Sequence, residues 1–122
     1  MAKKILVVDD NKDITDLVQA ILVLPAYSCI AVNSGQEGLD LLKKQDFDLV
    51  LLDLAMPGMS GLDVLSTLSE EARTDNIVIF TASPEYNEVD LEKLKEWHGK
   101  IERINKPFTD EELISLVEKH LK

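Results

Sequence analysis

Five short, largely aliphatic segments alternate with stretches of helical periodicity along the whole chain, and this alternation limits the possible folds more than any other feature. The segments with strand character are Lys4–Asp9, Tyr27–Val32, Asp48–Asp53, Asn76–Thr81 and Lys100–Asn105. Strands that alternate with helices predict a parallel sheet whose two faces are both covered by helices. The chain therefore belongs to the α/β class, with a predicted (βα)5 arrangement.

The stretches between these segments carry apolar residues at helical spacing, and several begin with capping residues. The apolar sets are Ile14/Leu17/Val18/Ile21/Leu22, Leu62/Leu65/Leu68, Leu91/Leu94/Trp97 and Leu113/Leu116/Val117/Leu121. Ser34 with Glu37, and Thr109 with Glu112, have the spacing of a capping box. Ser83 before a proline fits the start of the fourth helix, which we expect to run to about residue 98.

Composition also predicts the order of the strands. The first, third and fourth are unbroken aliphatic runs, as strands buried on both faces should be. The second carries Ser28 and the fifth carries Lys100, Glu102 and Arg103, so we expect these two at the sheet edges. The order 2-1-3-4-5 of a flavodoxin-like, doubly wound sheet satisfies this with right-handed crossovers. We expect residues 1–122 to form one domain of this kind.

Polar residues stand where the predicted strands end. Asp9 and Asp10 end the first strand, Asp53 ends the third, Thr81 ends the fourth, and Lys106 follows the fifth. Singly, each has a structural explanation, because Asp caps helices and begins turns. Together they fall at one edge of the sheet, and neighbouring strands are only about 4.8 Å apart, so the three carboxylates can converge.

Three converging carboxylates repel one another, and a hard divalent cation relieves that repulsion. Mg²⁺ prefers oxygen ligands and binds through carboxylates together with phosphate. Zn²⁺ is not favoured, because His98 and His120 lie far apart and no Cys/His spacing fits. A lysine such as Lys106 and a hydroxyl such as that of Thr81 can hold phosphate oxygens, and a carboxylate can form an aspartyl phosphate. Asp53 lies between these groups and is the best candidate nucleophile.

Four motifs carry a resemblance to a known family. The segments "LVVDD", "DLVLLDLAMPGMSG", "IFTAS" and "NKPF" occur in this order, and the match extends over essentially all 122 residues. With these motifs the chain resembles a response-regulator receiver domain and is similar to the stand-alone chemotaxis type. The resemblance implies a phosphoacceptor switch of a two-component system.

The resemblance also implies roles for the acidic residues. Asp53 is expected to accept a phosphoryl group from a phosphohistidine of a sensor kinase. Asp10 and Asp53 are expected to ligate Mg²⁺ together with the main-chain carbonyl of Ala55, while Asp9 acts mainly through a metal-bound water. The expected partners are a sensor histidine kinase or a phosphotransfer protein, and a downstream protein or output domain.

On the phosphate side, the resemblance implies that Thr81 and Lys106 hold phosphate oxygens and that the small Ala82 leaves room for the group. One residue departs from the family pattern. Receivers usually carry Tyr or Phe three residues before the lysine, where this chain has Arg103. We expect this arginine either to stay on the surface or to pair with acidic residues of the fourth helix.

Charge and hydropathy exclude other classes. A net charge of −10 does not favour direct binding to nucleic acid, which requires Lys and Arg on phosphates. No apolar run approaches the roughly 20 residues that span a bilayer. The first residues lack the pattern of a signal peptide, and the single cysteine, Cys29, cannot form an internal disulfide. We therefore expect a cytoplasmic protein without membrane contact.

Three alternatives to the switch remain at this stage. A receiver-like docking module that is not phosphorylated is compatible with Arg103 in place of the aromatic residue. A Mg²⁺-dependent phosphatase with an aspartate nucleophile requires D-x-D after its first strand, whereas this chain has Asp9, Asp10 and then Asn11. FMN binding on the same fold requires a first loop rich in Ser, Thr and Gly, and the acidic loop here would repel a phosphate.

Overall fold

A computed structural model describes residues 3–22, 27–53, 58, 61–70, 77–81, 101–105 and 108–121, with only the backbone given for 61–62, 65, 69–70, 77–81 and 101–105. The strands are β1 (Lys3–Val8), β2 (Tyr27–Val32), β3 (Leu49–Asp53), β4 (Ile77–Thr81) and β5 (Ile101–Asn105). The helices are α1 (Lys12–Ile21), α2 (Gly35–Lys44), α3 (Gly61–Glu70) and α5 (Asp110–Leu121). The helix predicted between Ser83 and residue 98 lies outside the described residues.

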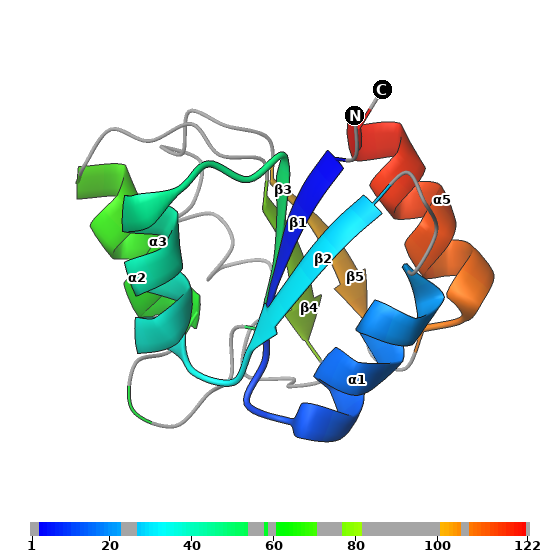
Figure 1. Ribbon diagram of the computed structural model, residues 1–122, viewed down its shortest axis with the longest axis horizontal. Helices are drawn as coiled ribbons and strands as arrows, with labels where there is room; N and C mark the ends of the chain where they lie inside the picture. The colour runs from blue at the N-terminus through cyan, green and yellow to red at the C-terminus, as the bar shows by residue number, and fades with distance from the viewer. Residues whose placement is uncertain are drawn as a thin grey trace.

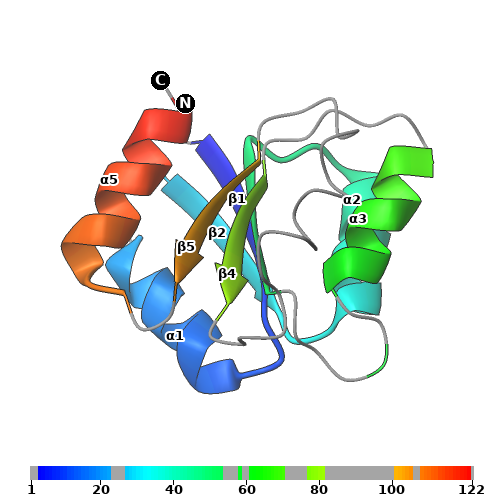
Figure 2. The same cartoon turned by 180° about the vertical axis from the view of Figure 1, so that it is seen from behind.

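The strands form one parallel sheet in the order β2-β1-β3-β4-β5, which confirms the predicted α/β fold and strand order. Helices α2 and α3 cover one face, and α1 and α5 cover the other (Figures 1 and 2). The strands β1 and β3 are flanked on both sides and covered on both faces. Their aliphatic residues from Ile5 to Val8 and from Leu49 to Leu52 have no exposed surface.

The alternation of side chains along β1 and β3 divides the core into two layers. On β1, Leu6 and Val8 pack with α2 and α3, while Ile5 and Val7 pack with α1 and α5. Strand β3 repeats this alternation between the two layers. Its residues pair with those of β1 without a break, from Ile5 beside Leu49 to Val8 beside Leu52. A shift of one residue would exchange the two layers, so the hydrophobic pattern fixes the register.

Polar caps define where the helices begin. The Asn11 side chain accepts a hydrogen bond from the Asp13 amide at 2.9 Å and caps α1. Ser34 accepts from the Glu37 amide at 3.2 Å and caps α2, as its spacing predicts. The capping box predicted for α5 is reciprocal, because each residue of the Thr109 and Glu112 pair bonds the other's main-chain amide.

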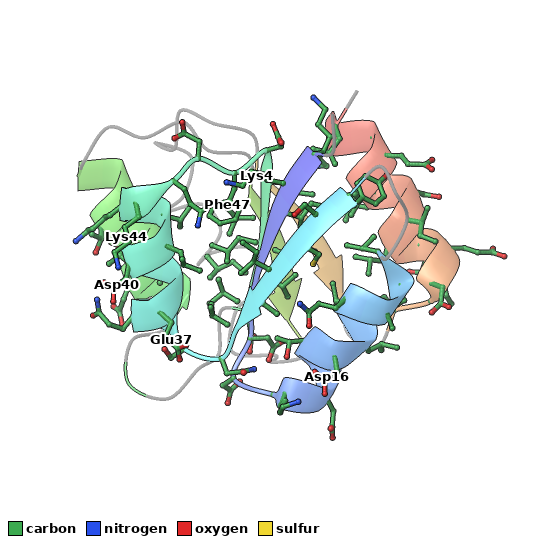
Figure 3. The ribbon with its side chains drawn as sticks, viewed as in Figure 1. Lys4, Asp16, Glu37, Asp40, Lys44 and Phe47 are labelled. Atoms are coloured by element: carbon green, nitrogen blue, oxygen red, sulfur yellow. The ribbon has the colours of Figure 1, made fainter. Side chains whose placement is uncertain are left out.

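All five strands run in the same direction, so they begin at one end of the sheet and finish at the other. We name the end where they begin the amino edge and the end where they finish the carboxyl edge. At the amino edge, Lys4 donates its amide to the Asp48 carboxylate at 2.7 Å, and its carbonyl accepts the Asp48 amide at 2.8 Å. The Lys4 ammonium also contacts the Gln45 side chain and lies 5.1 Å from the centre of the Phe47 ring (Figure 3). We call these contacts of Lys4 with Gln45, Phe47 and Asp48 the Lys4 clasp. They connect the beginning of β1 to the segment that leads into β3.

Candidate functional site

Three carboxylates meet at the carboxyl edge of the two central strands. Asp9 directly follows β1, Asp10 comes next, and Asp53 is the last residue of β3. Because Val8 lies beside Leu52, the chain places Asp9 next to Asp53. Oxygen atoms of the three carboxylates lie within 4.8 Å of one another. The structure thus brings together all three acids predicted to form the metal site.

The three acids differ in their access to water. Asp9 has no exposed surface and Asp53 is 4% exposed, whereas Asp10 is exposed. Taking charged carboxylates out of water is costly unless partners or a cation compensate. Of the three acids, Asp10 is therefore the one in contact with solvent, while Asp9 and Asp53 depend on their partners or on a cation.

Hydrogen bonds to the side chain and to the main chain of Asp9 hold it in place. Its carboxylate accepts a bond from the Asn11 amide at 2.9 Å. Its own amide donates to the Val32 carbonyl at 3.2 Å, and its carbonyl accepts from the Asn33 side chain at 2.9 Å. The first of these bonds orients the carboxylate, and the other two fix the main chain on strand β2 and the segment after it.

Helix α1 begins directly after the cluster. Asn11 is its N-cap, so the first turn of α1 lies next to Asp9 and Asp10. The positive end of the helix dipole stabilises nearby negative charge by about 0.3–1 kcal/mol at an exposed position. The start of α1 is therefore a favourable place for negatively charged side chains.

The donor set matches a magnesium ion. All three side chains offer hard carboxylate oxygens, and the cluster contains no histidine or cysteine among the described residues. Oxygen-only donors favour Mg²⁺, Ca²⁺ or Mn²⁺ over Zn²⁺ and Cu²⁺. Mg²⁺ keeps several waters and binds proteins through one or two carboxylates plus phosphate oxygens, so an open side such as that of Asp10 suits it.

The predicted phosphate-binding residues are placed only in part. Thr81 is the last residue of β4, and the register of Asp53 with Phe80 puts it one position beyond Asp53 at the same carboxyl edge. Its backbone position agrees with the prediction. Ala55, Ala82 and Lys106 lie outside the described residues. Arg103 lies within β5 beside Ile79, and the acids proposed to pair with it are outside the described residues.

Sequence reasoning missed the contribution of strand β2 to the site. The residues that hold Asp9 from this side are Val32, the last residue of β2, and Asn33, which follows it. A signal existed, because Asn33 is a polar residue directly after a predicted strand. The polar residue after this edge strand carries the same information as the polar residues at the ends of the other four strands.

Comparison with known proteins assigns the family. The model of the response regulator receiver domain matches residues 5–118, and the chain belongs to this family. Sporulation initiation phosphotransferase F of Bacillus subtilis is 32% identical over 121 residues, which are 99% of this chain and 95% of that protein. The transcriptional regulatory protein CpxR of Escherichia coli is 33% identical over 93% of this chain, but over only 47% of its own length.

A solved structure adds the geometric comparison. Response regulator TrrA of Thermotoga maritima, determined in complex with Mg²⁺ and BeF, superposes with a TM-score of 0.81 at 33% identity, over 98% of this chain and 99% of that one. Receiver domains bind Mg²⁺ at an acidic pocket, and they interact with sensor kinases or phosphotransfer proteins and with output domains.

The family defines the class of function. Receiver domains are phosphoacceptor switches of two-component systems, and the cluster of Asp9, Asp10 and Asp53 is consistent with this role. The alternative of a docking module that is not phosphorylated is not favoured. Within the described part of the chain, the helices are too short and too polar to cross a membrane.

Proposed function

We propose that residues 1–122 form a single receiver domain in which Asp53 is the phosphoacceptor. The observation that carries this proposal is the convergence of three carboxylates within 4.8 Å, with Asp53 as the member on the central strand β3. Asp53 is 4% exposed, so little of its side chain is in contact with solvent. Asp9 and Asp10 directly follow the neighbouring strand β1 and are left to bind the cation.

The carboxylates of Asp9, Asp10 and Asp53, with the carbonyl of Ala55, are the proposed ligands of Mg²⁺. Among these groups, Asp9 is proposed to act mainly through a metal-bound water. When bound, Mg²⁺ offsets the negative charge of the acids and of the incoming phosphoryl group. Without that compensation, attack of an anionic carboxylate on an anionic phosphoryl group is opposed by electrostatic repulsion.

In the proposed reaction, a carboxylate oxygen of Asp53 attacks the phosphorus of a phosphohistidine. An O–P bond forms and the N–P bond breaks. The electron pair of the broken bond stays on the imidazole, which leaves neutral when its other nitrogen carries a proton. Thr81 and Lys106 are proposed to hold oxygens of the transferred group, and the small side chain of Ala82 leaves space for it.

The proposed donor is a sensor histidine kinase or a phosphotransfer protein, and the reader of the signal is a downstream protein or an output domain. Similarity to a sporulation phosphotransferase and to part of a transcriptional regulator supports both the proposed donor and the proposed reader. The net charge of −10 supports signalling through protein contacts, without direct nucleic acid binding by these residues. We also propose a cytoplasmic location.

Labelling with a small phosphodonor such as acetyl phosphate tests the proposal. We expect Mg²⁺-dependent formation of an acid-stable, base-labile acyl phosphate on the wild-type protein, and its loss in Asp53→Asn. Asp40→Asn, which changes an exposed acid on α2, is the matched control and should label normally. Labelling of Asp53→Asn to the wild-type extent, or labelling that is insensitive to EDTA, would contradict the assignment.

A further inference from the structure

We propose that Asn33 is a positioning residue of the magnesium site, because it holds the main chain of Asp9 in place before the metal binds. The inference rests on the proposed function, since it concerns the same three acids. Asn33 is not a ligand and does not touch the reacting atoms. It acts through Asp9, and its effect is on how well the acidic cluster is organised in the metal-free protein.

The Asn33 amide uses both of its hydrogens on groups of other segments. Its Nδ2 donates to the Asp9 carbonyl at 2.9 Å and to the Thr15 hydroxyl at 3.2 Å. The Thr15 hydroxyl in turn donates to the Lys12 carbonyl at 3.0 Å. One side chain therefore joins the end of β1, the first turn of α1 and the segment between β2 and α2.

The bonds formed by Asn33 are directed at buried groups. Asp9 has no exposed surface and Thr15 is 2% exposed. Water competes poorly for such acceptors, so removing the donor leaves a buried carbonyl and a buried hydroxyl with fewer partners. The second anchor of Asp9 on the same side is the bond from its amide to the Val32 carbonyl. Asn33 and Val32 thus fix the main chain of Asp9 on both sides of its Cα atom.

This restraint matters because the three carboxylates repel one another in the absence of a cation. Their oxygens lie within 4.8 Å, so the repulsion favours movement of the segment of Asp9 and Asp10 away from Asp53, and the main-chain bonds of Asp9 oppose that movement. A site that is already organised spends less of the metal's binding free energy on ordering its ligands. Partners that orient metal ligands affect metal affinity for the same reason.

The expected effect follows from the value of one or two hydrogen bonds. We expect Asn33→Ala to weaken Mg²⁺ binding about threefold to tenfold, the range that corresponds to losing about one such bond. In the metal-free protein, hydrogen exchange of the Asp9 and Asn11 amides should accelerate by a similar factor, since both amides belong to the anchored segment. Thr15→Val removes only the second acceptor of Asn33 and should produce a smaller change in the same direction.

The control separates positioning from general stability. Ser34→Ala changes the adjacent residue, removes the N-cap of α2 and should lower the free energy of unfolding. The side-chain bonds of Ser34 go to Glu37, so the substitution leaves the described bonds of Asp9 in place. We therefore expect wild-type Mg²⁺ affinity in Ser34→Ala, measured by calorimetric titration, and wild-type exchange at Asp9 and Asn11.

The outcomes distinguish this inference from the proposed function. Unchanged Mg²⁺ affinity and unchanged exchange in Asn33→Ala would overturn the inference alone. Equal weakening in Asn33→Ala and Ser34→Ala would also overturn it, because the effect would then follow stability. If the wild-type protein took up no Mg²⁺, the proposed function would fail, and hydrogen exchange in the metal-free protein would decide the role of Asn33. Should Asn33→Ala fail to fold, Thr15→Val with the same two measurements decides.

Discussion

The charge of Asp10 is expected to destabilise the metal-free protein and to stabilise the magnesium-bound protein. Its carboxylate lies within 4.8 Å of those of Asp9 and Asp53. Two unit charges at this separation repel by about 1 kcal/mol in water and by about 3.5 kcal/mol at an effective dielectric constant of about 20. Replacing Asp10 with asparagine removes two such repulsions while keeping the size of the side chain.

The lower of these two repulsion energies applies to Asp10, because its side chain is exposed and water screens its charge. We expect Asp10→Asn to raise the free energy of unfolding by about 1–2 kcal/mol when divalent cations are absent. The substitution costs little in contacts, since no hydrogen bond or ion pair of the Asp10 carboxylate is present among the described residues.

Magnesium should reverse the order of stability. A ligand that binds only the folded state stabilises it by about 2.7 kcal/mol at a concentration 100 times its Kd. The wild-type protein should gain this amount, whereas Asp10→Asn should lose most of the gain because one proposed ligand is neutral. The variant is therefore expected to be the more stable protein in EDTA and the less stable one at high Mg²⁺.

Urea unfolding followed by circular dichroism, with EDTA or with Mg²⁺, measures both effects. Asp40→Asn serves as the control for the loss of one exposed negative charge outside the cluster, and it should shift both curves by less than about 0.5 kcal/mol. Lower stability of Asp10→Asn than of the wild type in EDTA would refute the electrostatic reasoning. Equal stabilisation of the two proteins by Mg²⁺ would refute the assignment of Asp10 as a ligand.

Two further predictions concern the core. Leu42 is 2% exposed in the layer beneath α2, so Leu42→Ala should lower the free energy of unfolding by about 2–5 kcal/mol, measured in urea. Burial raises the pKa of the Cys29 thiol from 9.0 to about 11, so the unfolded chain ionises first. After allowance for partial exposure, this difference in pKa adds about 1–2 kcal/mol to the free energy of unfolding. The added stability is complete below pH 9 and is lost between pH 9 and 11. Cys29→Ala should make that part of the pH profile flatter, and an unchanged slope would contradict the assignment.

The fold was predictable because its signals are redundant. Unbroken aliphatic runs at Ile5–Val8 and Leu49–Leu52 allow only central strands, and both runs are fully buried. The caps predicted at Ser34 and Thr109 start α2 and α5. The acidic cluster was predictable for the same reason, since parallel strands that end in acids bring them to one edge.

The support of the cluster was less predictable, because it depends on which side chain reaches which carbonyl. Asn33 could have capped α2, as Asn often does, but that position belongs to Ser34 and the Asn33 amide turns to Asp9. Strand boundaries carry a similar uncertainty. The predicted first strand includes Asp9, whereas β1 ends at Val8, because the following residues enter the capped turn of α1.

The Lys4 clasp has a consequence for how this domain can diversify. It secures the strands at the amino edge, where Figure 3 labels Lys4 and Phe47. The three acids and the described anchors of Asp9 lie at the carboxyl edge. Substitutions at Lys4, Phe47 or Asp48 can therefore adjust thermal tolerance while the chemistry stays constant. Evolution or a designer can therefore strengthen or weaken the attachment of β1 to β3 without replacing any of the three acids, because the two sets of residues lie at opposite ends of the same strands.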